Sequence, residues 1–76
     1  MDFSEALIKL KKGHALKRIG WNGKNLYVIT HKSDVCGDMF LIINENKDTI
    51  NSWQPSVSDL YAEDWEIYKE TYKGDY

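Results

Sequence analysis

The stretch "HALKRIGWNGKNLYVITH", residues 14–31, decides the fold because it holds two candidate strands on either side of one turn signal. In its first part polar and apolar residues alternate, and the candidates for the buried side are Ala15 or Leu16, together with Ile19. Its last part, residues 25–31, is rich in the β-branched and aromatic side chains that favour strands. The two parts predict an antiparallel hairpin.

Trp21 stands directly before the dipeptide Asn22-Gly23, which is a frequent signal for a tight hairpin turn. Both turn residues tolerate a positive φ, so we expect them to link the two strands. A turn usually lies in water, where a large indole gains little. The ring therefore either folds back over a core or is displayed for a ligand to stack on.

A short amphipathic helix is expected before this hairpin. Its apolar residues lie on one helical stripe: Phe3, Ala6, Leu7 and Leu10. Asp2 and Glu5 resemble a capping box at its start, and Gly13 is a natural residue to follow its end.

Three more strands and a second short helix are expected after the hairpin. The strand segments are "MFLIIN", "TINSW" and "WEIYKETY", residues 39–44, 49–53 and 65–72. Residues 39–44 are expected to be central in the sheet, and Trp65 is expected to pack in the core. Ser56 followed by Asp59 predicts an N-cap and one helical turn after Pro55, which blocks strand pairing. The predicted fold is α+β, with two helices on a four- to five-stranded antiparallel sheet.

The 76 residues are expected to form one domain, residues 1–76, and the tail from about residue 72 is expected to be frayed. A chain of this size buries only roughly 60% of its unfolded surface, so its core is marginal. A single cysteine, Cys36, excludes an internal disulfide, and with two histidines it argues against a closed zinc site. We expect no metal and no cofactor. Because a small domain without a disulfide or a metal usually gains stability from a partner chain, we expect this protein to self-associate.

The net charge of −2 argues against general binding of DNA or RNA, which requires a dominant cationic surface. No apolar run is long enough to span a bilayer, and no signal-peptide pattern opens the chain. We therefore expect a cytoplasmic protein without a membrane partner.

No set of residues predicts catalysis. His31, Asp34 and Cys36 are close in sequence but lie in a polar loop with no oxyanion-type glycine elbow. The start of the short helix explains Asp59, and Asp64 is expected to hold the last turn together. The chain is therefore predicted not to be an enzyme.

Trp21 and Trp53 each end a predicted strand and are followed by turn residues. Two indoles placed beside small polar groups could form a stacking pocket for a base or a sugar. The alternative is that both rings pack in the core or against another subunit.

The segments "FSEALIKLKKGHALKRIGWNGKN" and "SWQPSVSDLYAEDWEIY" resemble the Thoeris anti-defence two family of small phage proteins. The matching motifs are "F-x-x-A-L", "R-x-G-W-N-G" and above all "W-x-P-S-x-x-D-L-x-A-E-D-W". The resemblance runs from Phe3 to about Tyr68, and residues 30–51 carry no pattern that contributes to it.

The resemblance implies a protein that sequesters nucleotide signals made by bacterial TIR-domain proteins, such as cyclic ADP-ribose isomers or related ADP-ribose conjugates. The signal would be held without being cleaved, in the cytoplasm of the bacterial host, so that Thoeris defence stays inactive. The resemblance also implies a homo-oligomer, a tetramer more than a dimer, with ligand pockets between subunits.

It further implies a set of ligand-binding residues, among them Trp21 and Trp53, which would sandwich or flank the adenine. Asn22 and Gly23 would offer amide and backbone donors to a phosphate or a ribose. Arg18 would contribute charge to the same site.

Three further residues of the site follow from the same resemblance. Ser56 would donate to a phosphate, and Asp59 would accept from ribose hydroxyls, although helix capping alone also explains both residues. Asn25 would add a hydrogen bond. Two rival functions stay open: a protein-interaction module that blocks a host defence protein through the same aromatics, and a small nucleotide-processing enzyme.

Overall fold

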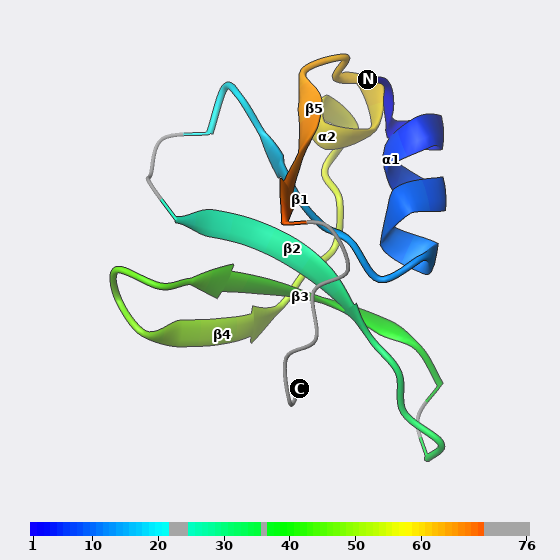
Figure 1. Cartoon of the computed structure of the whole chain (residues 1–76), viewed down its shortest axis with the longest axis vertical. Coiled ribbons are helices and arrows are strands. Elements are labelled where there is room, and N and C mark those ends of the chain that lie inside the picture. Colours follow the sequence, from blue (N-terminus) through cyan, green and yellow to red (C-terminus); the bar gives the residue numbers. More distant parts are fainter. Residues whose placement is uncertain (22–24, 36, 70–76) are drawn as a thin grey trace.

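The computed structural model describes residues 1–21, 25–35 and 37–69. Along this part of the chain the elements are α1 (Phe3–Lys11), β1 (Ala15–Arg18), β2 (Leu26–His31), β3 (Met39–Asn44), β4 (Thr49–Ser52), α2 (Val57–Tyr61) and β5 (Trp65–Lys69). The strands form one antiparallel sheet in the order β4-β3-β2-β1-β5, and both helices lie on the same side of it (Figure 1). The predicted α+β fold is confirmed.

Helix α1 forms where the apolar stripe predicts it. The Asp2 side chain caps its first turn by accepting from the backbone N–H of Glu5 at 3.0 Å. Ala6 and Leu10 are buried against the sheet. Gly13 follows the helix with a φ of +92°, a left-handed conformation that other residues adopt only at a cost. Local sequence therefore sets both ends of this helix.

The sheet separates two groups of apolar side chains. Beneath the helices, Leu16, Val28 and Trp65 pack with the buried residues of α1. The opposite side is centred on Tyr27 and Ile43, together with Ala15 and Ile29. Because side chains alternate along a strand, neighbouring residues of one strand contribute to different groups.

The β1–β2 pair is antiparallel as predicted, with Leu16 opposite Val28. Ala15 and Leu16 are both buried, on opposite sides of the sheet, and the register against β5 shifts between them. The prediction that Ile19 is buried is wrong, because β1 ends at Arg18 and the Ile19 side chain is 67% exposed.

The connection between β1 and β2 is longer than a two-residue turn. Strand β1 ends before Ile19 and β2 begins only at Leu26. Trp21 therefore lies beyond the end of its strand, whereas Trp53 follows β4 directly. Asn22 and Gly23 lie outside the described residues, so their turn conformation stays a prediction.

The position of β3 differs slightly from the prediction. It pairs on both sides, with β2 and with β4, but β2 is the middle strand of the five and β4 is the edge. Trp65 is 1% exposed, which confirms its predicted place in the core. The predicted tail, residues 72–76, lies outside the described residues. Among the described helices, neither is long and apolar enough to cross a membrane.

Candidate functional site

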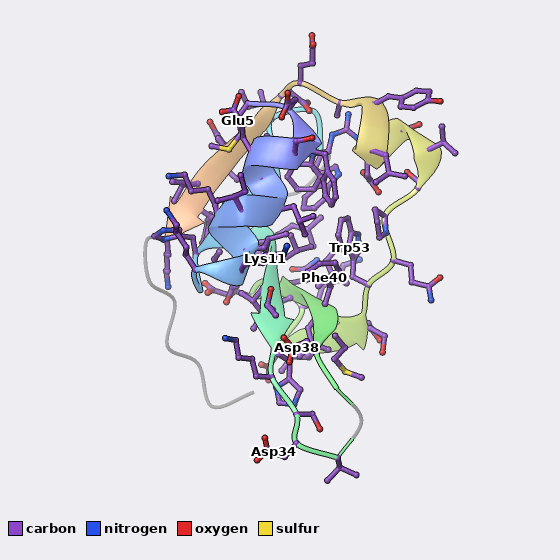
Figure 2. All side chains as sticks on the ribbon, turned by 90° about the vertical axis from the view of Figure 1, so that its right-hand side faces the viewer. Glu5, Lys11, Asp34, Asp38, Phe40 and Trp53 are labelled. Atoms are coloured by element: carbon purple, nitrogen blue, oxygen red, sulfur yellow. The ribbon has the colours of Figure 1, made fainter. Side chains whose placement is uncertain are left out.

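Three tryptophans meet on the helix side of the sheet. The ring centroid of Trp21 lies 5.4 Å from that of Trp65 and 6.3 Å from that of Trp53, and Trp53 lies 5.9 Å from Trp65. Phe3 extends the group through its contact with Trp65. The ring centroid of Phe40 lies 5.8 Å from that of Trp53. Figure 2 shows Phe40 and Trp53 near each other. Trp65 is buried, whereas Trp21 and Trp53 are half-buried. The cluster therefore combines a core with a partly open aromatic surface.

The orientation of the two half-buried indoles limits how they can hold a base. The planes of Trp21 and Trp53 are inclined by 70°, so the rings touch edge to face. A planar base can be sandwiched only between roughly parallel rings. In this arrangement the two indoles can flank a base, and a sandwich would require one ring to turn.

Two carboxylates hold Arg18 at the end of β1. Its Nε donates to Asp64 Oδ1 at 2.9 Å, and its Nη1 donates to Asp59 Oδ1 at 3.0 Å. The other oxygen of Asp64 accepts from the backbone N–H of Gly20 at 2.9 Å. The backbone N–H of Trp21 donates to the Arg18 carbonyl at 3.2 Å. These bonds fix the backbone of residues 18–21, and they therefore also fix the position of the Trp21 backbone that carries the indole.

The pKa values within this ion cluster favour the charged forms. Hydrogen bonding from the Arg18 guanidinium, followed by the N–H of Gly20, holds the pKa of Asp64 below its usual range. The same contact with Asp64 raises the pKa of Arg18. One guanidinium and two carboxylates therefore leave this cluster with a net negative charge at neutral pH.

Ser56 and Asp59 form the capping box of α2. The Asp59 carboxylate accepts from the Ser56 backbone N–H at 2.8 Å and from its Oγ at 2.9 Å, while the Asp59 N–H donates back to Ser56 Oγ at 3.2 Å. Burial acts to raise the pKa of Asp59, but hydrogen bonds from Ser56, Arg18 and Trp21 outweigh it and lower the pKa. Both residues are engaged in the fold, as the capping interpretation predicts.

Asp59 also connects α2 to the core. Its carbonyl accepts from the indole N–H of Trp65 at 3.0 Å. The helix thus turns its one buried residue, a carboxylate, inward, whereas Val57, Leu60 and Tyr61 face outward with 64%, 45% and 82% of their surface exposed.

Asn25 lies apart from these residues. Its side chain donates to Asn46 Oδ1 at 3.0 Å and accepts from the Tyr68 hydroxyl at 3.1 Å. Tyr68 packs on the sheet side opposite the helices. The structure therefore separates Asn25 from the tryptophan cluster.

The structure thus brings together five of the eight predicted site residues: Arg18, Trp21, Trp53, Ser56 and Asp59. Asn25 is elsewhere, and Asn22 and Gly23 lie outside the described residues. Asp64 has a wider role than the predicted one, since it holds the segment after β1. The described residues contain no cavity and no cluster of three or more metal-ligating side chains.

Sequence reasoning did not assign Gly20 a role. Its N–H donates to Asp64, and a side-chain carbon added at Gly20 would lie 3.0 Å from Asp64 Oδ2. The glycine inside "R-x-G-W" was the available signal, because a close backbone approach is a common reason for a glycine. Chemically, the arrangement offers an aromatic surface beside ionised hydrogen-bond acceptors.

This chain is similar in sequence to known proteins over the region that holds the tryptophan cluster. A family model described as Tad2-like, Thoeris anti-defense 2-like domain, matches residues 1–68. A protein named Thoeris anti-defense 2, from Bacillus phage SP01, is 35% identical over 83 aligned residues, which cover 88% of this chain and 93% of the relative. The tryptophans and their anchoring residues all lie inside the matched region. The chain belongs to the Thoeris anti-defense 2-like family.

Proposed function

We propose that this protein inhibits Thoeris defence by binding a nucleotide signal derived from ADP-ribose and holding it without cleaving it. Family membership and the name of the phage SP01 relative, Thoeris anti-defense 2, support the anti-defence role. The observation that carries the binding role is the pair of half-buried indoles, Trp21 and Trp53, fixed beside ionised carboxylates.

In this proposal the adenine packs against the open surface of one or both indoles. Stacking of a base on an aromatic side chain contributes roughly 1–3 kcal/mol. Because the rings are already held against Trp65, little side-chain freedom is lost on binding. The conformational cost that usually weakens binding is therefore small here.

Ribose hydroxyls would donate to the carboxylates beside the indoles. Asp64 is the more accessible acceptor, with 32% of its side chain exposed, compared with 11% for Asp59. A carboxylate offers about four acceptor positions. Asp59 already accepts from the N–H and Oγ of Ser56, from Arg18 and from Trp21, whereas Asp64 accepts from Arg18 and Gly20 and keeps capacity for a ligand. We therefore propose that the ribose role predicted for Asp59 falls to Asp64.

Phosphate recognition requires donors beyond this acidic cluster. Arg18 is neutralised by Asp59 and Asp64, so we propose that it positions the segment more than it binds phosphate. In this proposal the phosphate donors come from Asn22 and Gly23, which the sequence predicts to form a turn, and a second copy of the chain encloses the ligand. The assembly we propose is a homo-oligomer, a tetramer more than a dimer, acting in the host cytoplasm.

The test is to incubate the purified protein with the product of a TIR-domain enzyme, remove free ligand, and heat the complex. Mass spectrometry of the released material distinguishes the functions. Recovery of the intact signal supports sequestration. An altered product would indicate an enzyme, and no retention would contradict both.

One observation favours a second candidate function. The outward side of α2 exposes three apolar residues, Val57, Leu60 and Tyr61, next to the cluster. Such a surface suits a protein-interaction module that blocks a host defence protein directly. That module would inhibit defence without retaining any nucleotide, and substitution of Tyr61 by a charged residue would abolish the inhibition.

A further inference from the structure

Strand β4 is an edge strand that lacks most features that protect sheet edges. In the described chain it pairs with β3 alone, and all four of its residues are exposed (Figure 1). Its sequence, "TINS", contains no charge and no proline. Natural proteins usually protect edges with charges, prolines or bulges, because an open edge can pair with another strand.

The opposite edge of the same sheet is protected. Strand β5 carries Glu66 and Lys69, and its pairing with β1 has a register shift. Lys17 of β1 forms an ion pair with Glu66 at 3.1 Å. Among the described strands, β4 is therefore the edge strand that lacks charged residues and is open to pairing with a partner strand.

The hydrogen-bond pattern shows which backbone groups of β4 face outward. The Trp53 N–H donates to the Phe40 carbonyl at 2.9 Å, and these residues are opposite each other in the continued register. Hydrogen-bonded pairs alternate along an antiparallel ladder, so Asn51 and Thr49 also direct their backbone groups toward β3. Ile50 and Ser52 direct theirs away from it.

We propose that β4 pairs antiparallel with β4 of a second copy of this chain, so that two sheets join into one. A two-fold axis makes such an interface self-complementary. In the proposed register the outward residues pair with each other, so that Ile50 lies opposite Ser52 of the second copy. Asn51 then lies on the two-fold axis, opposite Asn51 of the second copy. This register uses the outward N–H and C=O groups of both residues.

The second copy is a better occupant than an unrelated strand for two reasons. An uncharged edge can meet itself without like-charge repulsion, which a charged edge cannot. The short chain also has a marginal core and gains stability from association. The inference concerns assembly and rests on the homo-oligomer of the proposed function, not on the ligand.

Asn51 gives the sharpest test because the proposed register places two copies of its side chain directly opposite each other, with Cβ atoms about 4.5–5.5 Å apart. Asn51→Asp puts two negative charges there with almost no change in shape. We expect self-association to weaken roughly tenfold or more. Analytical ultracentrifugation should show the particle mass falling to half that of the wild type.

Gln54→Glu is the matched control, since it adds the same charge at an exposed position just outside β4. It should leave the mass unchanged. Asn51→Lys should dissociate the assembly as Asn51→Asp does. Mixing the two variants should restore the wild-type mass, because each interface then joins opposite charges.

Ile50→Pro tests the backbone directly. It removes an outward N–H that the β3–β4 ladder does not use, so the fold should persist and the mass should halve. A monomeric wild type, or assemblies unaffected by Asn51→Asp and Ile50→Pro, would overturn the inference. Ligand retention by the wild type is measured separately, so its failure would contradict the proposed function and leave the β4 interface standing.

Discussion

The two sides of the sheet use aromatic residues in opposite ways. On the side away from the helices, Tyr27 and Tyr68 stack face to face, 4.6 Å apart and inclined by 11°. Their hydroxyls are bonded, to Glu45 at 2.8 Å and to Asn25 at 3.1 Å. This pair has the features of a structural element, with both its faces and its polar tips engaged.

On the helix side the tryptophans meet edge to face and lie beside charged groups. Trp65 is the buried centre, and Trp21 and Trp53 keep part of their surface open. Under the proposed function, the ligand binds on the tryptophan side, and the tyrosine side stabilises the sheet. Substitutions on the two sides should therefore affect different measurements.

Trp65→Ala should have the largest effect on stability. It removes a buried ring and leaves the Asp59 carbonyl without its indole donor, at a cost of about 3–5 kcal/mol. Urea denaturation followed by circular dichroism measures this loss. A loss below about 1 kcal/mol would show that the ring is not the centre of the core.

Asp59→Asn should have the next largest effect. It keeps the size of the side chain but removes an ionised acceptor of Ser56 and Arg18, at a cost of about 1–3 kcal/mol. Asp59→Glu is the comparison that keeps the charge and changes the length. Equal stability of the wild type and Asp59→Asn would contradict the role of the capping box.

The two lowered carboxyl pKa values predict acid sensitivity. A group whose pKa is lower in the folded state stabilises the fold above its unfolded pKa and loses that contribution as the pH falls. For Asp59 and Asp64, stability should therefore be full at pH 7 and decline below about pH 4. In Asp64→Asn the decline measured by acid titration should be shallower than in the wild type. An unchanged acid transition would contradict the ion cluster.

Tyr68→Phe should have the smallest effect. It keeps the stacked ring and removes only the hydroxyl bond to Asn25, which costs about 0.5–1.5 kcal/mol. Ligand retention should be the same as in the wild type. A loss of ligand in this variant would place the site on the tyrosine side.

The elements of the fold could be predicted because their signals are local. The stripe of α1 and the Ser56–Asp59 cap of α2 each lie within one or two turns of chain. The alternation of residues 65–69 likewise predicts that Trp65 is in the core, where the structure has it. Helix and strand periodicity needs no knowledge of distant residues.

The arrangement of the site could not be predicted in the same way. Arg18 and Asp64 are 46 residues apart in sequence, and their contact depends on the pairing of β1 with β5. The edge-to-face contact of Trp21 with Trp53 depends on the paths of two connections, the one between β1 and β2 and the one between β4 and α2. The separation of Asn25 from the tryptophans likewise depends on its contacts with Asn46 and Tyr68, which are 21 and 43 residues away in sequence.

The most direct test of the central claim is a titration of the TIR-derived signal into matched variants, followed by calorimetry. We expect Trp21→Ala and Trp53→Ala each to lose most of the binding while keeping a folded circular dichroism spectrum. Tyr68→Ala, its control on the other side of the sheet, should bind with wild-type stoichiometry. Wild-type binding in both tryptophan variants would show that the ligand does not bind at these two indoles.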